Sequence, residues 1–367
     1  MPPTASAEGL ARVLEASLQR IASHPAWNPE KACIILSGGL DTCIVAEAGA
    51  DVLGLKVAFT VLLTPEATDR PYASQVAQRA KLPHTVLDLS LESLLEEHMP
   101  TGVELLGSFD GMTLRNSVVC LAALKKAKEM GFTCAVTGDA ADEILGGYTF
   151  THGMDEARWS SHRDHMCKVM TFDSVPLGAS LGIHVASPYS DPEVVEYALR
   201  FSKAQCVGER NGVVTGKVPL RDAYPWVYSA ERRKDPIEVG SGSSVLGRGY
   251  FDQRMTDSEF EEDKKSAAEA GVHGLRDKEH AYYFGIFKKV FPSLQVPGKP
   301  RYGDDPCPKC GFQLSSPVQT FCNTCGHYDA NLRGGSDAGK AALAQAGSSS
   351  SSSGGGGTTS GGSSSDS

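Results

Sequence analysis

The chain has 367 residues, enough for two domains or for one large domain with appendages. A hydrophobic content of 41% suits a protein with a sizeable core, but no apolar run approaches the ~20 residues of a membrane-spanning helix, so we expect no membrane partner. The formal net charge of −9 argues against a broad nucleic-acid-binding surface.

The start of the chain lacks the basic-then-apolar order of a signal peptide. Four of the 10 cysteines cluster between positions 307 and 325, and the others are scattered. This pattern is typical of a reducing compartment rather than of a disulfide framework. We therefore expect a cytoplasmic protein.

Short apolar runs alternate with amphipathic segments over residues 8–137. The predicted helices cover residues 8–23, 40–48, 68–81, 90–98 and 113–130, and the predicted strands are 32–36, 52–62, 84–89 and 132–137. Strands that alternate with helices at this spacing predict an α/β fold with a doubly wound parallel sheet. Ligands of such sheets bind beyond the carboxyl ends of the strands, where Ser37 and Thr137 fall.

The rest of the chain changes character twice. From about residue 150 to 300 the pattern is mainly helical, with one clear helix predicted over 191–202, capped by Asp191 and started by Pro192. A Ser/Gly-rich sequence beyond residue 331 predicts a disordered tail. The predicted parts are an N-terminal helix (1–30), an α/β domain (31–299, with its α/β core at 31–150 and a mainly helical part at 151–299), a cysteine module (300–330) and the tail (331–367).

The turn after the first strand reads Ser37-Gly-Gly-Leu-Asp-Thr42. Its small residues let backbone N–H groups approach a ligand, and free amides at a helix N-terminus attract anions. The common phosphate loop is excluded because no lysine follows the glycines. The pattern S-G-G-x-D-[ST] instead resembles the pyrophosphate loop of the ATP pyrophosphatases, which holds the pyrophosphate released when ATP donates AMP. An ordinary glycine turn at a strand end is the competing interpretation.

Three acidic residues lie in the segment Thr137-Gly-Asp-Ala-Ala-Asp-Glu-Ile-Leu-Gly-Gly-Tyr148, directly after the fourth predicted strand. In isolation such a cluster is equally well explained as a solvated helix cap. Opposite a pyrophosphate loop, however, Asp142 and Asp41 are suited to hold Mg²⁺, which takes hard oxygen ligands and bridges phosphates.

The order of these two segments resembles the synthetase domain of the asparagine synthetases. Three further stretches fit in the same order: Thr113–Ser117 before the second segment, Ser187–Pro192 at a helix start, and Lys217-Val-Pro-Leu-Arg221 followed by Arg232–Pro236. The resemblance covers residues 32–240. It implies the PP-loop ATP pyrophosphatase fold, which is adenine nucleotide alpha-hydrolase-like, and a ligase that adenylates a carboxylate such as aspartate and then forms an amide with ammonia or another amine.

The resemblance also implies roles for single residues. Asp41 and Asp142 would hold Mg²⁺, Lys217 would neutralise charge as pyrophosphate leaves, and Asp139 stands where the family has a glutamate that accepts a proton from the attacking amine. The implied contacts to ATP and pyrophosphate are Ser37, Gly38, Gly39, Leu40, Asp41, Thr42, Val61, Thr137, Gly138 and Lys217. Of these, Val61, Thr137 and Gly138 align with positions that line the adenosine in the family. Without the resemblance, Lys217 would be interpreted as a solvated surface lysine.

Two departures concern the second substrate. The family's S-G-E-G-S-D-E is T-G-D-A-A-D-E here, so Asp139 is one methylene shorter than glutamate, and Ala140 and Ala141 replace glycine and serine. Position 2 is Pro2, and only about thirty residues precede the first strand, so we expect no glutaminase domain with an N-terminal cysteine. Ammonia would then come free or from a partner, for example a separate glutaminase.

A third motif joins Cys307-Pro-Lys-Cys310 to Cys322-Asn-Thr-Cys325. Two C-x-x-C turns at this spacing predict a zinc ribbon in which the four thiolates form a closed, structural Zn²⁺ site. A redox-active C-x-x-C pair is the less favoured interpretation.

Two other functions compete with the ligase. A tRNA-modifying ATP pyrophosphatase of the thiolation type would also combine a pyrophosphate loop with a zinc ribbon, although the acidic body and the K-x-x-L-R segment disfavour it. A non-catalytic nucleotide-binding protein is compatible with the altered residues around Asp139, whereas the intact Asp41, Asp142 and Lys217 favour an enzyme.

Overall fold

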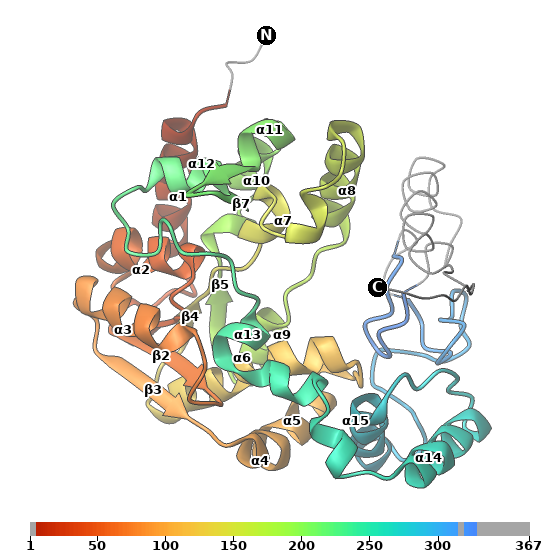
Figure 1. Ribbon diagram of the computed structural model, residues 1–367. Coiled ribbons are helices and arrows are strands. Elements are labelled where there is room, and N and C mark those ends of the chain that lie inside the picture. The colour runs from red at the N-terminus through yellow and green to blue at the C-terminus, as the bar shows by residue number, and fades with distance from the viewer. Residues whose placement is uncertain (1–4, 315–318, 329–367) are drawn as a thin grey trace, which may run out of the picture.

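The computed structural model describes residues 5–314 and 319–328. Its centre is a sheet of five parallel strands in the order β3–β2–β1–β4–β5 (Figure 1). The strands are β1 (Ala32–Ile35), β2 (Val57–Leu62), β3 (His84–Asp88), β4 (Cys134–Val136) and β5 (His184–Ala186). A separate hairpin joins β6 (Gly208–Arg210) to β7 (Val213–Thr215). The prediction of an α/β fold with a doubly wound parallel sheet is confirmed.

Helices cover both faces of the sheet, so alternate residues of a strand are buried in two different cores. Cys33 of β1 joins the core beneath α6, whereas Ile34 joins the core beneath α1 and α2. The first core is built mainly from α5, α6 and α15, and the second from α1, α2, α10 and α12. The helices are α1 (Ala7–Ala22), α2 (Leu40–Leu53), α3 (Asp69–Arg79), α4 (Leu91–Ser93), α5 (Met99–Leu106), α6 (Gly111–Glu129), α7 (Ala141–Leu145), α8 (Glu156–Val169), α9 (Ser174–Ser180), α10 (Pro192–Ala198), α11 (Lys203–Cys206), α12 (Val218–Ala223), α13 (Ile237–Ser241), α14 (Asp257–Glu269) and α15 (Lys278–Val290).

Three boundaries differ from the sequence prediction. The strand β5 comes from the part expected to be mainly helical, and its register with β4 completes the sheet. The helix expected over 191–202 ends at Ala198, and Ser202 and Gln205 form a capping box that starts a separate helix, α11. The run 52–62 becomes a strand only from Val57, since Gly54 adopts φ +67° and ends α2.

The cysteine module packs against the α/β domain at the start of α6. Thr324, between two of the cysteines, accepts hydrogen bonds through its carbonyl from Phe109 N (2.7 Å) and Ser108 Oγ (3.3 Å). Phe312 of the module meets Phe287 of α15 with ring centroids 5.8 Å apart. The module therefore shares the core beneath α6 rather than standing apart from the domain.

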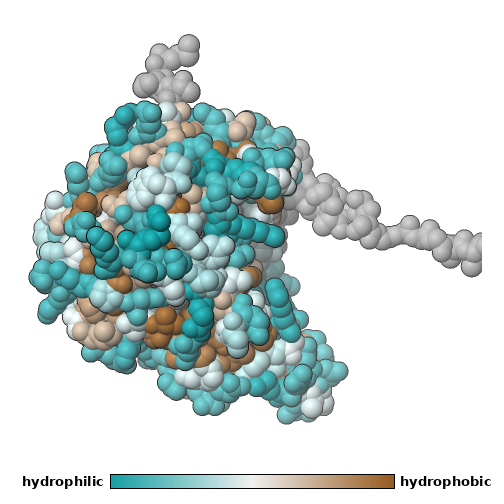
Figure 2. All heavy atoms as spheres, turned by 60° about the vertical axis from the view of Figure 1, so that its left-hand side comes forward, coloured by the Kyte–Doolittle hydropathy of each residue, from teal (hydrophilic) through white to brown (hydrophobic). Residues whose placement is uncertain are grey.

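The face turned forward in Figure 2 carries mostly hydrophilic residues, with hydrophobic residues in small groups between them. Among residues 5–314 and 319–328, no helix is long and apolar enough to cross a membrane. The predicted Ser/Gly-rich tail lies outside the described residues.

Candidate active site

The turn between β1 and α2 is held in shape by its own side chains. Ser37 Oγ accepts a hydrogen bond from Gly39 N (3.2 Å) and lies 3.1 Å from Thr42 Oγ1. Gly38 has φ +72°, and a Cβ at this position would lie 2.4 Å from the backbone nitrogen of Ala73. Only glycine suits such a position. Gly39 is the N-cap of α2, so the first amides of this 14-residue helix open toward the turn and attract anions.

A second segment, residues 229–235, supports this turn from outside. Ser229 Oγ donates to Gly38 O (2.6 Å), and Arg232 donates to Ser37 O (3.2 Å). Arg232 is fixed in turn by an ion pair with Asp69 (2.8 Å) and by the ring of Tyr72, whose centroid lies 4.1 Å from the guanidinium carbon. No role was predicted for Arg232, although it lies in the basic segment 232–236 that carried part of the resemblance.

A cluster of alternating charges lies next to the turn. Lys217 Nζ lies 2.5 Å from Asp41 Oδ2 and 2.8 Å from Asp142 Oδ1, and Lys234 Nζ donates to Asp142 Oδ2 at 2.8 Å. The structure thus brings Asp41, Asp142 and Lys217 together, as the resemblance implied. Lys234 belongs to this cluster but was not predicted, and the Arg-Arg-Lys run at 232–234 was the available signal.

Burial makes the electrostatics of this cluster strong. Burial alone would raise the pKa of Asp142, but Lys217 and Lys234 lower it below its usual value, so this carboxylate is ionised at neutral pH. Burial raises the pKa of Asp41 against the opposing attraction of Lys217. The pKa of Lys234 is raised: burial would lower it, but the carboxylates of Asp142 and Asp41 outweigh that effect.

Glycines near Lys217 leave the space that its side chain needs to reach Asp41 and Asp142. Lys217 is only 3% exposed and has a left-handed backbone (φ +58°) at the N-cap of α12. A Cβ on Gly147 would lie 1.8 Å from Asp142 Oδ1 and 2.5 Å from Lys217 Cε. A Cβ on Gly216 would lie 1.9 Å from Gly146 O. The G-G-Y segment and the residue before Lys217 therefore leave space in which the ion pairs form.

The two carboxylates fit a hard cation. Asp41 Oδ1 is buried and has no hydrogen-bond partner within residues 5–314 and 319–328. Asp41 and Asp142 approach the same ammonium group from two different elements, the start of α2 and α7. Oxygen donors of this kind, beside an anion-binding turn, suit Mg²⁺ held together with phosphate.

Asp139 lies at the end of β4 in a strained turn. Its Oδ2 accepts hydrogen bonds from Thr137 Oγ1 (2.7 Å) and Ser174 Oγ (2.6 Å), and Ser187 Oγ donates to its carbonyl (2.6 Å). Burial raises the pKa of Asp139 against these hydrogen bonds. The next residue, Ala140, has φ +81°, a conformation that glycine adopts at lower cost.

The residues expected to line the adenosine lie at the same edge of the sheet. Val61 is a buried residue of β2, and Thr137 directly follows β4. Gly138 packs on the turn, because a Cβ there would lie 2.9 Å from Asp41 Cβ. The loop after β2 is tied to α13 by the hydrogen bond from Leu63 N to Ser241 O (2.8 Å).

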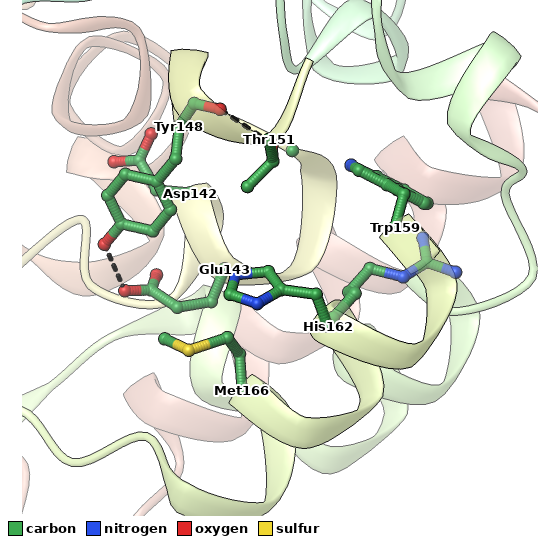
Figure 3. A pocket seen from close by; sticks show the side chains of 9 residues that line it. Asp142, Glu143, Tyr148, Thr151, Trp159, His162 and Met166 are labelled. Carbon is green, nitrogen blue, oxygen red and sulfur yellow. Dashed lines mark hydrogen bonds between the residues drawn. The ribbon is translucent and has the colours of Figure 1, made fainter. Parts of the chain in front are cut away.

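The two adjacent acids of the second motif point in different directions. Asp142 forms ion pairs with the two lysines of the charge cluster. Glu143 accepts a hydrogen bond from Tyr148 Oη (2.6 Å) beside a small cavity lined also by His162 and Met166 (Figure 3). This cavity of about 10 Å³ has room for about one water molecule, so it is not a substrate pocket. Burial raises the pKa of Glu143 despite its hydrogen bond with Tyr148.

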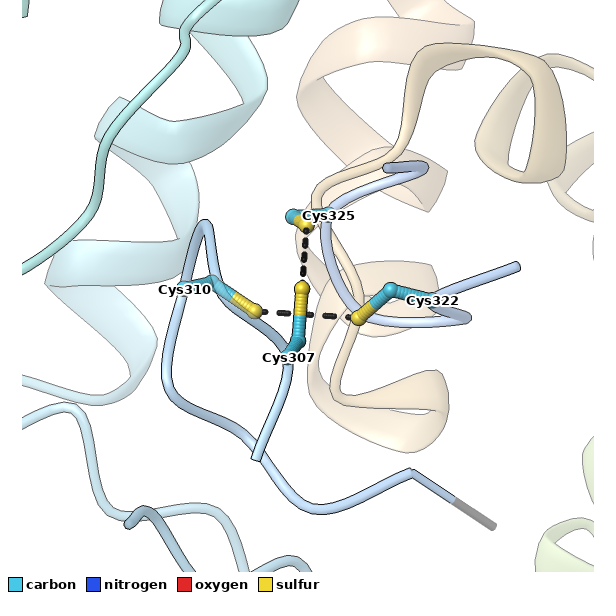
Figure 4. Close-up of side chains that lie close together, drawn as sticks. All are labelled: Cys307, Cys310, Cys322 and Cys325. Atoms are coloured by element: carbon cyan, nitrogen blue, oxygen red, sulfur yellow. Dashed lines mark hydrogen bonds between the residues drawn. The ribbon is translucent and has the colours of Figure 1, made fainter. Parts of the chain in front are cut away.

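The four cysteines of the module form a closed cluster (Figure 4). All four sulfurs lie within 4.8 Å of one another and are buried, and the pairs Cys307–Cys325 and Cys310–Cys322 are each 3.7 Å apart. A tetrahedral zinc ion with Zn–S bonds of about 2.3 Å places its sulfurs about 3.8 Å apart. The donor set therefore fits Zn²⁺, and in the described part of the chain it is the one group of three or more His, Cys, Asp or Glu side chains close enough to share a metal ion.

Comparison with known proteins points to one enzyme family. Residues 26–179 match the asparagine synthase family model, a range that holds both the Ser37–Thr42 turn and the Thr137–Tyr148 segment. An asparagine synthetase (glutamine-hydrolyzing) of Triphysaria versicolor is 25% identical over 300 residues, which cover 73% of this chain and 50% of that protein. Asparagine synthetase B (glutamine-hydrolyzing) of Escherichia coli (strain K12) is 23% identical over 297 residues, covering 73% and 52%. The chain spans about half the length of the curated relatives that it matches.

Proposed function

We propose that the chain is an ATP-dependent ligase that adenylates a carboxylate, aspartate or a similar acid, and then forms an amide with ammonia or another amine. The observation that carries the proposal is the cluster of Asp41, Asp142, Lys217 and Lys234 beside the glycine turn. Its two carboxylates suit a phosphate-bound Mg²⁺ and its two ammonium groups suit pyrophosphate, whereas a solvated helix cap would need neither the buried Lys217 nor shared ion-pair partners.

In the first half-reaction the substrate carboxylate attacks the α-phosphorus of ATP, and the bond to pyrophosphate breaks. Ser37, Gly38, Gly39, Leu40 and Thr42 would bind the phosphates through amides and hydroxyls, with Val61, Thr137 and Gly138 beside the adenosine. Lys217 and Lys234 would neutralise the charge that develops on the leaving pyrophosphate. Mg²⁺, held by Asp41 and Asp142, would supply additional charge neutralisation between the phosphates.

In the second half-reaction an amine attacks the acyl carbon, AMP leaves with the bonding electrons, and the amine loses a proton. Asp139 is the proposed acceptor of that proton, and its raised pKa favours this role because a base is most effective near the operating pH. Its carboxylate, on a side chain shorter than glutamate, is held in place by hydrogen bonds from Thr137 Oγ1 and Ser174 Oγ. Free ammonia, or ammonia from a separate glutaminase or another protein partner, would be the nitrogen source.

The cysteine cluster supports a structural role for Zn²⁺. Four buried thiolates leave no open coordination position, so the metal would hold the module together rather than activate a substrate.

The same module is the observation that favours a second candidate function, a tRNA-modifying ATP pyrophosphatase of the thiolation type. Such an enzyme would use the same ATP chemistry on a base instead of a carboxylate. The net charge of −9 disfavours this function because tRNA binding requires basic residues that contact phosphates.

Pyrophosphate release from ATP separates these functions. We expect release with aspartate plus ammonia, or with another carboxylate in a panel, and only background release with bulk tRNA. Release that requires tRNA would replace the ligase by the second function, and tight ATP binding without release under any condition would indicate a non-catalytic nucleotide-binding protein.

A further inference from the structure

A cleft of about 340 Å³ lies between the cysteine module and the α/β domain, away from the glycine turn. Its walls come from Phe109 before α6, from residues 272–276 between α14 and α15, and from Lys309 and Gly326 of the module. Its volume falls in the range of small-molecule sites. We propose that this cleft binds a small phosphorylated ligand, independently of the proposed ligase activity.

The charge of the lining differs from that of the whole protein. Arg276, Lys309 and three histidines line the cleft, and no aspartate or glutamate is among the described residues that line it. The chain as a whole has 44 acidic and 35 basic residues, so a lining without acids is not its average surface. Lys309 and His273 are exposed at the cleft and are accessible to a ligand.

Arg276 is held in position before any ligand arrives. Its guanidinium donates to Gly326 O (2.7 Å) and to Asp110 Oδ1 (2.7 Å), which links the module to the cap of α6. The side chain is nevertheless 44% exposed, so its charge remains available to the cleft. A fixed guanidinium loses little freedom on binding an oxyanion.

His280 adds a buried hydrogen-bond donor to this wall. The residue is 2% exposed, and its Nδ1 accepts a hydrogen bond from Arg276 N (3.2 Å). Burial lowers the pKa of His280 to about 4, so the ring is neutral at pH 7 and Nε2 carries its hydrogen. Within residues 5–314 and 319–328, Nε2–H meets no acceptor. A buried donor without a partner costs about 1–3 kcal/mol and calls for an acceptor from outside the chain.

The remaining surfaces of the cleft suit an organic ligand rather than a bare ion. Phe109 stacks on the ring of His280 with centroids 5.2 Å apart and 23° between the planes, and both rings are buried in the wall of the cleft. Tyr328 also lines the cleft and is 56% exposed. A phosphate offers several acceptor oxygens and up to two charges to the cations, while an aromatic or sugar group can pack against the exposed ring of Tyr328.

The test is a binding titration of the full, zinc-loaded chain with inorganic phosphate, ribose 5-phosphate, AMP and uncharged adenosine. Binding is followed by calorimetry and by the NMR signal of His280 Nε2–H, neither of which depends on turnover. We expect inorganic phosphate, ribose 5-phosphate and AMP each to shift the His280 signal. The order of their affinities shows whether phosphate, a sugar phosphate or a nucleotide is preferred. A shift of the His280 signal by adenosine at concentrations as low as those of AMP, or an unmoved His280 signal with all ligands, would overturn the proposal.

Three variants locate the binding. Lys309→Glu should weaken phosphate binding at least tenfold, whereas Lys289→Glu, the same charge change at an exposed position of α15 that does not line the cleft, should leave it unchanged. Lys234→Ala alters only the charge cluster beside the glycine turn and should also leave the His280 shift unchanged. If Lys234→Ala abolishes binding and Lys309→Glu does not, the ligand lies at the turn and the cleft is not a site.

Discussion

The charge cluster at the glycine turn and the cysteine cluster of the module both gather groups that would repel one another when ionised. The first balances its carboxylates internally, because Lys217 and Lys234 contact Asp41 and Asp142 directly. The second holds four sulfurs within 4.8 Å, and as thiolates these would be balanced by a bound cation. We therefore expect the first region to fold without a metal and the second to depend on one.

Removing one cysteine should have the largest effect. Cys325→Ser breaks the closed donor set, so we expect loss of bound zinc and a lower midpoint of thermal unfolding. We also expect faster amide hydrogen exchange at Phe109 and Thr113, because Thr324 O accepts from Phe109 N, and Gly326 O accepts from Arg276, which contacts the cap of α6. Structural zinc sites contribute on the order of 10 kcal/mol to such modules. Zinc content, calorimetry and hydrogen exchange measure the three effects.

Cys167→Ser is the matched control, because Cys167 is a half-buried cysteine outside the cluster. A Cys325→Ser protein that keeps one equivalent of zinc and the parental midpoint would show that the module does not depend on the metal.

Asp41→Asn should produce the opposite outcome, with a large loss of activity and an intact fold. The substitution removes a proposed Mg²⁺ ligand but keeps the volume, and Lys217 retains Asp142 as a partner. We expect pyrophosphate release to fall on the order of 10³-fold, a typical effect of removing preorganised charge from a reaction centre. The unfolding midpoint should stay near that of the parent, and turnover at the parental rate would eliminate the Mg²⁺ assignment. Asp51→Asn, an exposed acid on the same helix, is the control.

Substitution of Asp110 tests how much the contact between the cysteine module and the α/β domain contributes to the free energy of unfolding. It is 1% exposed, accepts a hydrogen bond from Thr113 N (2.9 Å) as the cap of α6, and pairs with Arg276. Asp110→Ala should cost about 2 kcal/mol of unfolding free energy, because the loss of a cap costs about 1 kcal/mol and the loss of the ion pair with the half-exposed Arg276 adds up to about 1 kcal/mol.

Asp155 offers a cap without the module contact. It is exposed and its carboxylate accepts a hydrogen bond from Arg158 N (2.8 Å) at the start of α8, so Asp155→Ala should cost about 1 kcal/mol. Equal costs of the two variants in denaturant unfolding would mean that the contact between the module and α6 contributes nothing measurable.

The two regions also differ in what sequence alone could predict. The strand–turn–helix at Ser37–Thr42 and the cysteine spacing are local patterns, and the structure confirms the fold class and brings Asp41, Asp142 and Lys217 together. Arg232 and Lys234 were missed because their partners, Ser37, Asp69 and Asp142, are distant in sequence and no local spacing connects them. The strand β5 was missed because three residues are too few for a periodic signal. The contact of the module with α6 left no pattern at all, since it consists mainly of backbone carbonyls.

Asp69, which supports the turn through Arg232, is a carboxylate whose burial is not fully balanced by the neighbouring cations. Its pKa is raised from 3.8 to about 6 by burial, which outweighs the ion pair with Arg232 and the attraction of Lys234, while Asp235 raises it further. A raised folded-state pKa means that the folded protein binds this proton more tightly than the unfolded chain. The resulting stability is fully present below the unfolded pKa of 3.8 and is lost as the pH rises through about 6.

Asp69→Asn should therefore change the pH dependence of stability, by at most about 3 kcal/mol for a shift of this size. The difference in unfolding free energy between Asp69→Asn and the parent should move in favour of the variant as the pH rises from 4 to 7, because only the parent must ionise a buried acid. Denaturant unfolding at pH 4, 5, 6 and 7 measures this difference and cancels the other carboxylates, which titrate in both proteins. Parallel profiles would mean that Arg232 balances Asp69 completely, and the turn region would then be neutralised throughout by its own cations.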